Sequence, residues 1–205
     1  MEPKESLALE TRLKKILEAE SAAITSIPLT DAYAKTVGLI LEHIHRRGGK
    51  IVTSGMGKAG QIAMNIATTF SSTGTPAVFV HPSEAQHGDL GILQKNDLLL
   101  LLSNSGKTTE VIELIDLARE LYPDIPYVVL TGNPDSPLAA SADTVLFTGA
   151  APEVCPLGLT PTTSTTMMTV IGDLLVVATM EAIGFTKEEY AKRHHGGYLG
   201  QKSKS

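Results

Sequence analysis

Five short apolar runs alternate with longer segments of helical spacing, and this alternation constrains the fold more than any other feature of the sequence. Each run is apolar at consecutive positions, which is typical of parallel strands buried on both faces. Alternating strands and helices predict an α/β fold, a three-layer αβα sandwich around a doubly wound, five-stranded parallel sheet of the flavodoxin-like kind. The expected strands are residues 50–53, 77–80, 97–102, 127–130 and 144–147.

Helical periodicity predicts the remaining elements. Two amphipathic helices within about residues 6–47 precede the first strand, and Gly48-Gly49 ends the second of them. The later helices are expected at residues 61–70, 108–121, 163–183 and 187–192. Because the sequence has no internal repeat and no linker, residues 1–205 are expected to form one domain with a short tail at 193–205.

Composition excludes several classes of function. Lys plus Arg number 17 against 22 Asp plus Glu, and a net charge of −5 does not suit a general nucleic-acid or anionic-membrane surface. The longest apolar runs, such as residues 97–102, are far shorter than the roughly 20 residues of a membrane span. The first residues lack the pattern of a signal peptide. With Cys155 as its only cysteine, the chain has no disulfide framework, and we expect a cytoplasmic protein.

The loop after the third strand has the composition of a phosphate site. It reads Ser-Asn-Ser-Gly-Lys-Thr-Thr-Glu over residues 103–110 and runs directly into a helix. Free backbone N–H groups and the helix dipole at such a point suit a phosphate monoester. Helix capping alone would need one hydroxyl or amide side chain, whereas this loop offers five. They are Ser103, Asn104, Ser105, Thr108 and Thr109.

A glycine loop follows the first strand. Residues 55–60 read Gly-Met-Gly-Lys-Ala-Gly, which matches the spacing of a dinucleotide-binding turn. The second strand, however, ends without the acid that would hold a ribose, since the first acid after it is Glu84. Lys58 is more informative, because a cation here could neutralise an enolate or a phosphate. The alternative is a solvated lysine at the start of a helix.

Two further segments contain titratable side chains. In residues 81–91, two histidines six positions apart stand with Glu84 and Asp89, but the spacing fits no standard zinc pattern. A catalytic or hydrogen-bonded role for His87 is favoured over a metal, and a plain loop histidine is the alternative. In residues 151–166, three prolines surround a single acid, Glu153, whose burial is costly unless it is partnered or functional. Cys155 is interpreted as a small buried filler.

These segments together closely resemble the sugar isomerase (SIS) domain of D-arabinose 5-phosphate isomerases, over about residues 30–201. The Ser-Asn-Ser-Gly loop marks SIS domains in general, whereas the His-Pro and Cys-Pro-Leu-Gly stretches are narrower signals. The resemblance implies an aldose–ketose isomerase that interconverts D-ribulose 5-phosphate and D-arabinose 5-phosphate. That reaction feeds the synthesis of Kdo for lipopolysaccharide or capsule. The stretches concerned are residues 55–58, 81–91, 103–106, 155–166 and the Gly-Gly-x-Leu-Gly tail.

The resemblance also implies site residues, without a metal or cofactor. Its lysine falls on Lys58, its two glutamates on Glu110 and Glu153, and its two histidines on His87 and His194. Substrate contacts are expected from Ser54, Gly55, Ser103, Asn104, Ser105 and Thr108.

The sequence departs from the family pattern in three places. Many members continue into a pair of CBS domains, whereas this sequence ends at Ser205, so regulation is left open. His195 replaces a proline after His194, and Lys107 stands where an acid often follows Ser-Asn-Ser-Gly. These two departures leave the fine specificity open.

An isomerase of this type needs a base, a group that stabilises the enediolate and an acid for the oxygens. We assign proton abstraction to Glu153 or Glu110, with Glu153 preferred because its rigid apolar loop should raise its pKa towards neutrality. We expect a homotetramer in which His194 reaches the Lys58 and Glu153 site of a neighbour. A nucleotide sugar is a candidate feedback ligand. The main alternative is a non-enzymatic SIS module that senses a sugar phosphate or a nucleotide-sugar end product, and a Rossmann oxidoreductase ranks third.

Overall fold

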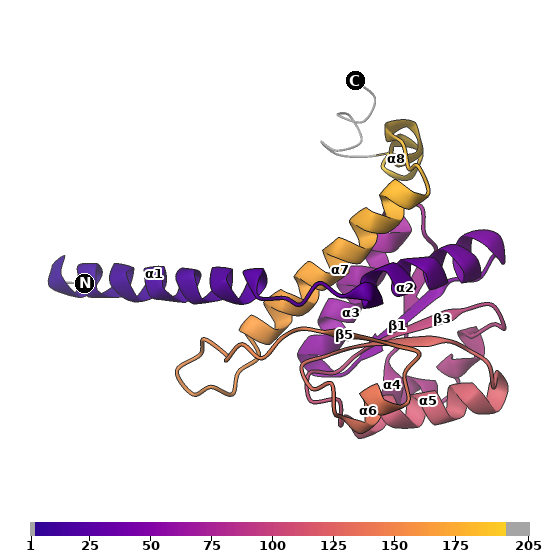
Figure 1. Cartoon of the computed structure of the whole chain (residues 1–205), viewed down its shortest axis with the longest axis horizontal. Helices are drawn as coiled ribbons and strands as arrows, with labels where there is room; N and C mark the ends of the chain where they lie inside the picture. The colour runs from indigo at the N-terminus through magenta and orange to yellow at the C-terminus, as the bar shows by residue number, and fades with distance from the viewer. Residues whose placement is uncertain (1–2, 196–205) are drawn as a thin grey trace.

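The computed structural model describes residues 3–195, and its five strands form one parallel sheet in the order β2-β1-β3-β4-β5 (Figure 1). This order and the helices on both faces confirm the predicted doubly wound αβα sandwich. The strands are β1 (Ile51–Gly55), β2 (Ala77–Phe79), β3 (Leu98–Leu102), β4 (Tyr127–Thr131) and β5 (Thr144–Phe147).

The central strand β3 shows why the apolar runs are continuous. It consists of five leucines, and successive side chains of a strand point to opposite faces of the sheet. Leu98, Leu100 and Leu102 pack into the core cluster beneath α2 (Asp31–Ile40), α3 (Gly57–Ser72) and α7 (Thr163–Ala182). The alternate Leu99 and Leu101 pack into a second cluster beneath α5 (Thr109–Leu121). Both faces of the strand are therefore buried.

α7 is the longest helix on its face of the sheet. Its length and composition would allow it to cross a membrane, but half of its most apolar window is buried within the protein, as in a core helix. Gly172 allows the close approach of α3, because a Cβ atom there would lie 2.5 Å from a side-chain carbon of Ile66. The helix α8 (Lys187–Arg193) follows at the C-terminal end of α7.

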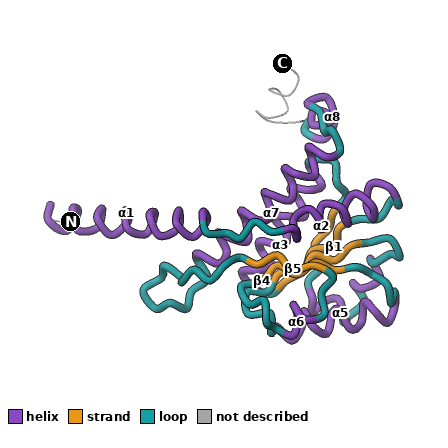
Figure 2. Tube along the Cα trace, viewed as in Figure 1, coloured by secondary structure: helices purple, strands orange, loops and turns teal. Residues whose placement is uncertain are grey.

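The first helix, α1 (Pro3–Thr25), projects from the rest of the molecule as an arm (Figure 1). Its inner end contacts α7. The long loop between β5 and α7, residues 148–162, extends in the same direction as α1 (Figure 2). Both segments therefore flank the N-terminal end of α7.

The structure differs from the expected elements in a few places. The predicted helix within residues 31–47 is α only to Ile40 and continues as a π-helical segment, η1 (Leu41–Arg46). Three short elements were not predicted, because four residues are too few to show a helical period. They are α4 (Pro82–Ala85), the 3-10 turn η2 (Asp89–Ile92) and α6 (Pro137–Ala140).

Candidate active site

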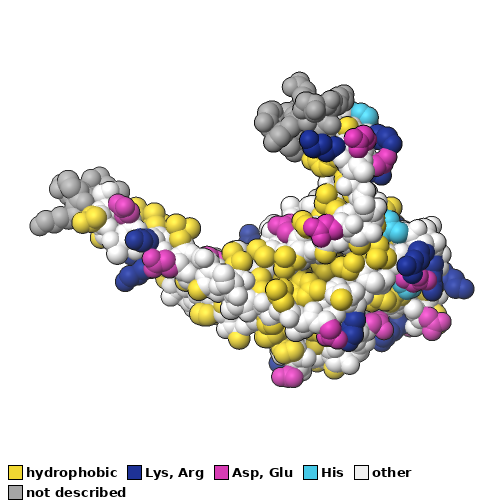
Figure 3. Space-filling view, turned by 45° about the horizontal axis from the view of Figure 1, so that its top comes forward, with side chains coloured by type: hydrophobic (Ala, Val, Ile, Leu, Met, Phe, Trp, Pro, Cys, Tyr) yellow, Lys and Arg dark blue, Asp and Glu magenta, His cyan; other side chains and the backbone are white. Residues whose placement is uncertain are grey.

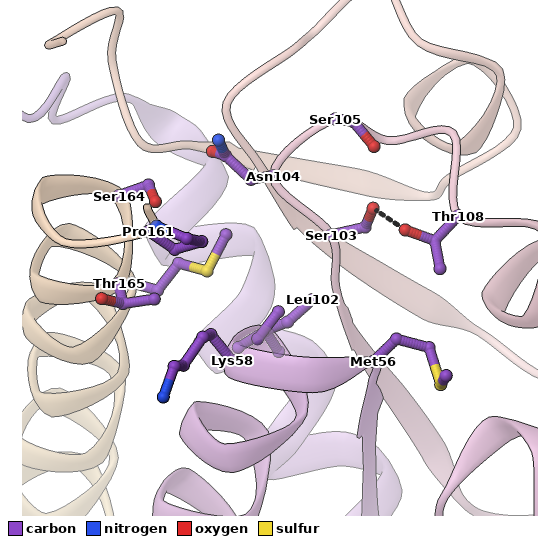
Figure 4. A pocket seen from close by; sticks show the side chains of 12 residues that line it. Met56, Lys58, Leu102, Ser103, Asn104, Ser105, Thr108, Pro161, Ser164 and Thr165 are labelled. Carbon is purple, nitrogen blue, oxygen red and sulfur yellow. Dashed lines mark hydrogen bonds between the residues drawn. The ribbon is translucent and has the colours of Figure 1, made fainter. Parts of the chain in front are cut away.

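A cavity of about 270 Å³ lies at the carboxyl ends of β1 and β3, where the strand order reverses direction (Figure 4). This is the point at which doubly wound sheets bind ligands. Three segments form its walls: the loop after β1, the loop after β3 and the start of α7. The lining residues are Met56, Lys58, Ala59, Leu102, Ser103, Asn104, Ser105, Thr108, Pro161, Ser164, Thr165 and Met168.

The Ser-Asn-Ser-Gly loop forms one wall of the cavity. The hydroxyl groups of Ser103 and Thr108 lie 2.8 Å apart, and Ser103 Oγ also accepts the N–H of Gly106 at 3.1 Å. These bonds fix the shape of the loop. Ser105 Oγ accepts the N–H of Lys107 at 3.2 Å, which leaves the hydroxyl proton of Ser105 free to donate to a ligand. Asn104 is exposed beside it, so the loop presents donors at the start of α5.

Lys58 stands in the first turn of α3, which begins at Gly57 rather than at the predicted residue 61. The glycine pattern has a packing reason, since a Cβ atom at Gly60 would lie 2.4 Å from the carbonyl oxygen of Gly55. Lys58 is exposed at the cavity, and no acidic side chain of the described residues forms a salt bridge with it. It therefore offers an unpaired cation beside the phosphate-type loop.

The first turn of α7 forms the wall opposite this loop (Figure 4). Ser164 and Thr165 belong to a run of hydroxyl side chains, residues 162–166, that would by itself cap and open α7. The signal for a functional role was present, because this run contains more hydroxyl side chains than a cap needs.

Two of the predicted substrate contacts do not line this cavity. Ser54 is fully buried, and its hydroxyl donates to the carbonyl oxygen of Val80 at 2.7 Å. Gly55 is buried where β1 meets β3, and a Cβ atom there would lie 2.9 Å from the carbonyl oxygen of Leu102. Both residues are buried at the end of β1 and support the loop that follows this strand.

Glu153 holds the N-terminus of α7. Its Oε2 atom accepts the N–H of Thr162 at 2.7 Å, the hydroxyl of Thr162 at 2.9 Å and the N–H of Ser164 at 3.3 Å. Burial raises the pKa of Glu153, but the hydrogen bonds from Ser164 and Thr162 outweigh it, and the pKa lies below its ordinary value. The expectation of a pKa raised towards neutrality is therefore wrong. Glu153 lines a separate shallow groove against α1.

Glu110 and His87 belong to segments on the face of the sheet that α5 covers, opposite α3 and α7. Glu110 is half-buried in the first turn of α5, and His87 is exposed in the segment that follows α4. The amide of Gln86 donates to Glu113 at 2.6 Å, which holds this segment against α5. Neither residue lines the cavity. In the part of the chain that the structure describes, no group of three or more His, Cys, Asp or Glu side chains is placed to hold a metal ion.

His194 lies far from the cavity within one chain. It follows α8, beyond the C-terminal end of α7, whereas the first turn of α7 lines the cavity. A helix of 20 residues is about 30 Å long. His195 is exposed, and the rest of the predicted tail, residues 196–205, lies outside the described residues.

Cys155 is not the buried filler that the sequence suggested. It is partly exposed, and its Sγ atom accepts the N–H groups of Leu159 at 3.2 Å and Thr160 at 3.1 Å. Burial raises the pKa of Cys155, but the hydrogen bonds from Thr160, Leu159 and Leu157 together outweigh it and lower the pKa to about 7.

Comparison with known proteins places the chain in a family. Residues 43–178, well over half of the chain, match the SIS domain, and the chain belongs to that family. It is 49% identical over 154 residues to arabinose 5-phosphate isomerase KdsD of Pseudomonas aeruginosa, which covers 75% of this chain and 47% of that protein. The protein of the same name from Yersinia pestis is 44% identical over 190 residues, 92% of this chain and 56% of that protein. The resemblance found in the sequence is confirmed.

Solved structures are similar over almost the whole chain. A candidate phosphosugar isomerase involved in capsule formation from Bacteroides fragilis is 66% identical, with a TM-score of 0.91 over 93% of this chain and 99% of that one. An Escherichia coli protein in complex with arabinose 5-phosphate is 32% identical, with a TM-score of 0.84 over 95% of this chain and 100% of that one. The chain spans about half the length of the curated relatives that it matches.

Proposed function

We propose that the protein is an aldose–ketose isomerase that interconverts D-ribulose 5-phosphate and D-arabinose 5-phosphate. The observation that carries the proposal is the cavity in which the unpaired Lys58 meets the Ser103–Thr108 loop at the start of α5. The names of the curated relatives and the arabinose 5-phosphate complex of the Escherichia coli protein support this choice of substrate.

The phosphate group anchors the substrate. Ser105 and Asn104 donate hydrogen bonds to its oxygens, and the dipole of α5 favours its negative charge. Anchoring one end of an open-chain sugar in this way brings the carbonyl end into one orientation. Lys58 then lies beside the oxygen that becomes negative.

Isomerisation moves one carbon-bound proton. A carboxylate removes the proton from C1 of the ketose, and the electron pair of that C–H bond forms the C1=C2 bond of an enediolate. Lys58 stabilises the oxygen charge of this intermediate. The same carboxylic acid returns the proton to C2, while a histidine moves the proton between the oxygens and assists ring opening.

Glu153 and Glu110 are the two proposed bases. The lowered pKa keeps Glu153 ionised and able to accept a proton at neutral pH, although it also makes Glu153 a weaker base than a raised pKa would. Its Oε1 atom is free of hydrogen bonds from described residues, because all three of its bonds are made to Oε2. Exchange of the C1 proton of D-ribulose 5-phosphate with solvent, measured in E153Q and E110Q, identifies the base. The variant that lacks the base should lose this exchange.

The site is proposed to be shared between subunits of a homotetramer. His194 and the cavity lie at opposite ends of α7, so a neighbour would have to supply the histidine. α1 and the outer face of α7 expose apolar side chains that an assembly would cover (Figure 3). They are Leu7, Leu13, Ile16 and Leu17 on α1 and Leu174 and Val177 on α7. His87 is proposed as the second histidine.

The biological setting is proposed from the similarity of the chain to these relatives. The product would feed Kdo synthesis for lipopolysaccharide or capsule in the cytoplasm, and the Bacteroides fragilis relative is described by its role in capsule formation. A nucleotide sugar derived from that product is the proposed feedback ligand.

Incubation of the purified protein with D-ribulose 5-phosphate in D₂O tests the function. We expect NMR to detect D-arabinose 5-phosphate with deuterium at C2, and Lys58→Ala to abolish the signal. Unphosphorylated D-ribulose is the control for the phosphate site. Tight binding of the sugar phosphate without turnover would favour the sensor alternative.

A further inference from the structure

Two carboxylates from distant parts of the chain meet at the first turn of α7. Glu153 comes from the loop of residues 148–162 and accepts three hydrogen bonds from Thr162 and Ser164. Glu20 comes from α1, and its Oε1 atom accepts the hydroxyl of Thr163 at 3.0 Å. Three segments, α1, the loop and α7, are therefore joined at one point.

The hydroxyl group of Thr163 connects Glu20 to the loop. Thr163 is buried, and its single hydroxyl proton is donated to Oε1 of Glu20. A lone pair of the same oxygen is then directed at the N–H of Val154, which donates to it at 3.2 Å. Val154 follows Glu153 in the chain. Glu20 thus fixes the peptide bond that adjoins Glu153.

Ala151 packs against the core at the start of the loop, whereas the outer part of the loop is exposed. Leu157 and Leu159 are 76% and 78% exposed, and the donors to Cys155 Sγ among the described residues are N–H groups of the same loop. The start of α7 is therefore an anchor for the part of the loop that carries Glu153. Ser164 and Thr165 of the same turn line the cavity, so a displacement of this turn changes the cavity wall and the position of Glu153 together.

We infer that Glu20 is a positioning residue for the proposed isomerase: acting through Thr163, it fixes the loop that carries Glu153 and couples α1 to the cavity. The inference rests on the proposed function for its effect on catalysis. The second oxygen of Glu20, Oε2, is buried and lacks a hydrogen-bond partner among the described residues. Burying a carboxylate oxygen in this way is costly, which favours a role for its one bond to Thr163.

Kinetics of two matched pairs of variants test the inference. Thr163→Val removes the connecting hydroxyl at nearly constant volume, and its control is Thr179→Val, a buried threonine of α7 whose hydroxyl lacks a partner among the described residues. Glu20→Ala removes the acceptor, and its control is Glu18→Ala on the exposed part of α1. Glu20→Gln keeps an oxygen that can accept from Thr163, so it should restore activity.

We expect Thr163→Val and Glu20→Ala to lower kcat about ten- to a hundredfold, the size of effect that follows from a small misplacement of a reacting group. KM for D-ribulose 5-phosphate should stay within about twofold, because the Ser103–Thr108 loop is untouched, and both controls should resemble the wild type. Equal losses in Thr163→Val and Thr179→Val, or an unchanged kcat in Glu20→Ala, would overturn the inference.

Hydrogen exchange gives a readout that does not depend on turnover. The amides of Thr162 and Ser164 donate to Glu153 and are not altered by either substitution, so their exchange rates report where Glu153 lies. We expect faster exchange in Thr163→Val and Glu20→Ala but not in the controls. If the wild type lacks isomerase activity and the exchange effect is present, the coupling stands and the proposed function fails. If the wild type is active and exchange is unchanged, the coupling is wrong.

Discussion

The imidazole ring of His194 stacks on the phenol ring of Tyr190, with ring centroids 3.7 Å apart and an angle of 8° between the rings. One nitrogen of the imidazole, Nδ1, lies 3.0 Å from the carbonyl oxygen of Tyr190. These contacts hold the ring on α8, at the opposite end of α7 from Lys58. Within one chain, His194 therefore cannot take part in chemistry at the cavity.

Complementation between two inactive variants tests whether a neighbour supplies this histidine. Lys58→Ala and His194→Ala should each be inactive alone. After the two are unfolded and refolded together, about a quarter of wild-type activity should return, because a quarter of randomly assembled two-chain sites contain both intact residues. Native mass spectrometry verifies that mixed oligomers have formed. A mixture that contains such oligomers and stays inactive would contradict a shared site.

Ser105→Ala tests the phosphate loop. The change removes a hydroxyl whose proton is free for the ligand, a charge-assisted hydrogen bond worth about 1.5–3 kcal/mol. The KM for D-ribulose 5-phosphate should therefore rise roughly ten- to a hundredfold. Ser141→Ala, an exposed serine at the end of α6, is the control. An unchanged KM would mean that Ser105 only shapes the loop.

The sheet and the cavity could be predicted from the sequence because both depend on local patterns. The leucine run of β3 and the Ser-Asn-Ser-Gly sequence after it identify a buried strand and the loop at its end. In a doubly wound sheet, that loop must lie beside the one that carries Lys58. The topology therefore assembled Lys58, Ser103, Ser105 and Thr108 as expected.

The surroundings of Glu153 could not be predicted, because they depend on contacts between distant segments. The sequence indicated an acid in an apolar loop, which argues for a raised pKa. The groups that lower it are donors at the start of α7, nine to eleven residues later, which reach Glu153 only through the tertiary fold. The bond between Glu20 and Thr163, 143 positions apart in the chain, has no local signal either.

The lowered pKa of Glu153 predicts how stability depends on pH. A carboxyl group whose pKa is lower in the folded than in the unfolded state stabilises the fold above its unfolded pKa. That stabilisation is lost as the pH falls from about 4.5, the ordinary value, through the lower folded pKa. The difference in melting temperature between the wild type and Glu153→Gln should therefore be constant near neutral pH and narrow below about 4.5. A difference that widens on acidification would contradict the lowered pKa.

Cys155 should react with thiol reagents at neutral pH. The N–H groups of Leu159 and Thr160 stabilise its thiolate, and its pKa of about 7 leaves much of it ionised there. The labelling rate plotted against pH should have its midpoint near 7, below the value of about 8.5 for an unperturbed cysteine. Cys155→Ser serves as the blank. A midpoint of about 8.5 or higher would show that these hydrogen bonds do not stabilise the thiolate in solution.

The buried carboxylate of Asp97 should contribute strongly to stability. Asp97 is fully buried before β3, where it accepts the ammonium of Lys50 at 2.7 Å and the backbone N–H groups of Lys50 at 3.0 Å and Gln94 at 2.8 Å. Asp97→Ala leaves these three donors unpaired next to the core, and removing one partner of a buried ion pair costs about 3–5 kcal/mol. Urea unfolding should show a loss of this size, whereas the exposed Asp116→Ala should remain within about 0.5 kcal/mol of the wild type. A loss below about 1 kcal/mol in Asp97→Ala would mean that water reaches the freed donors and replaces the carboxylate.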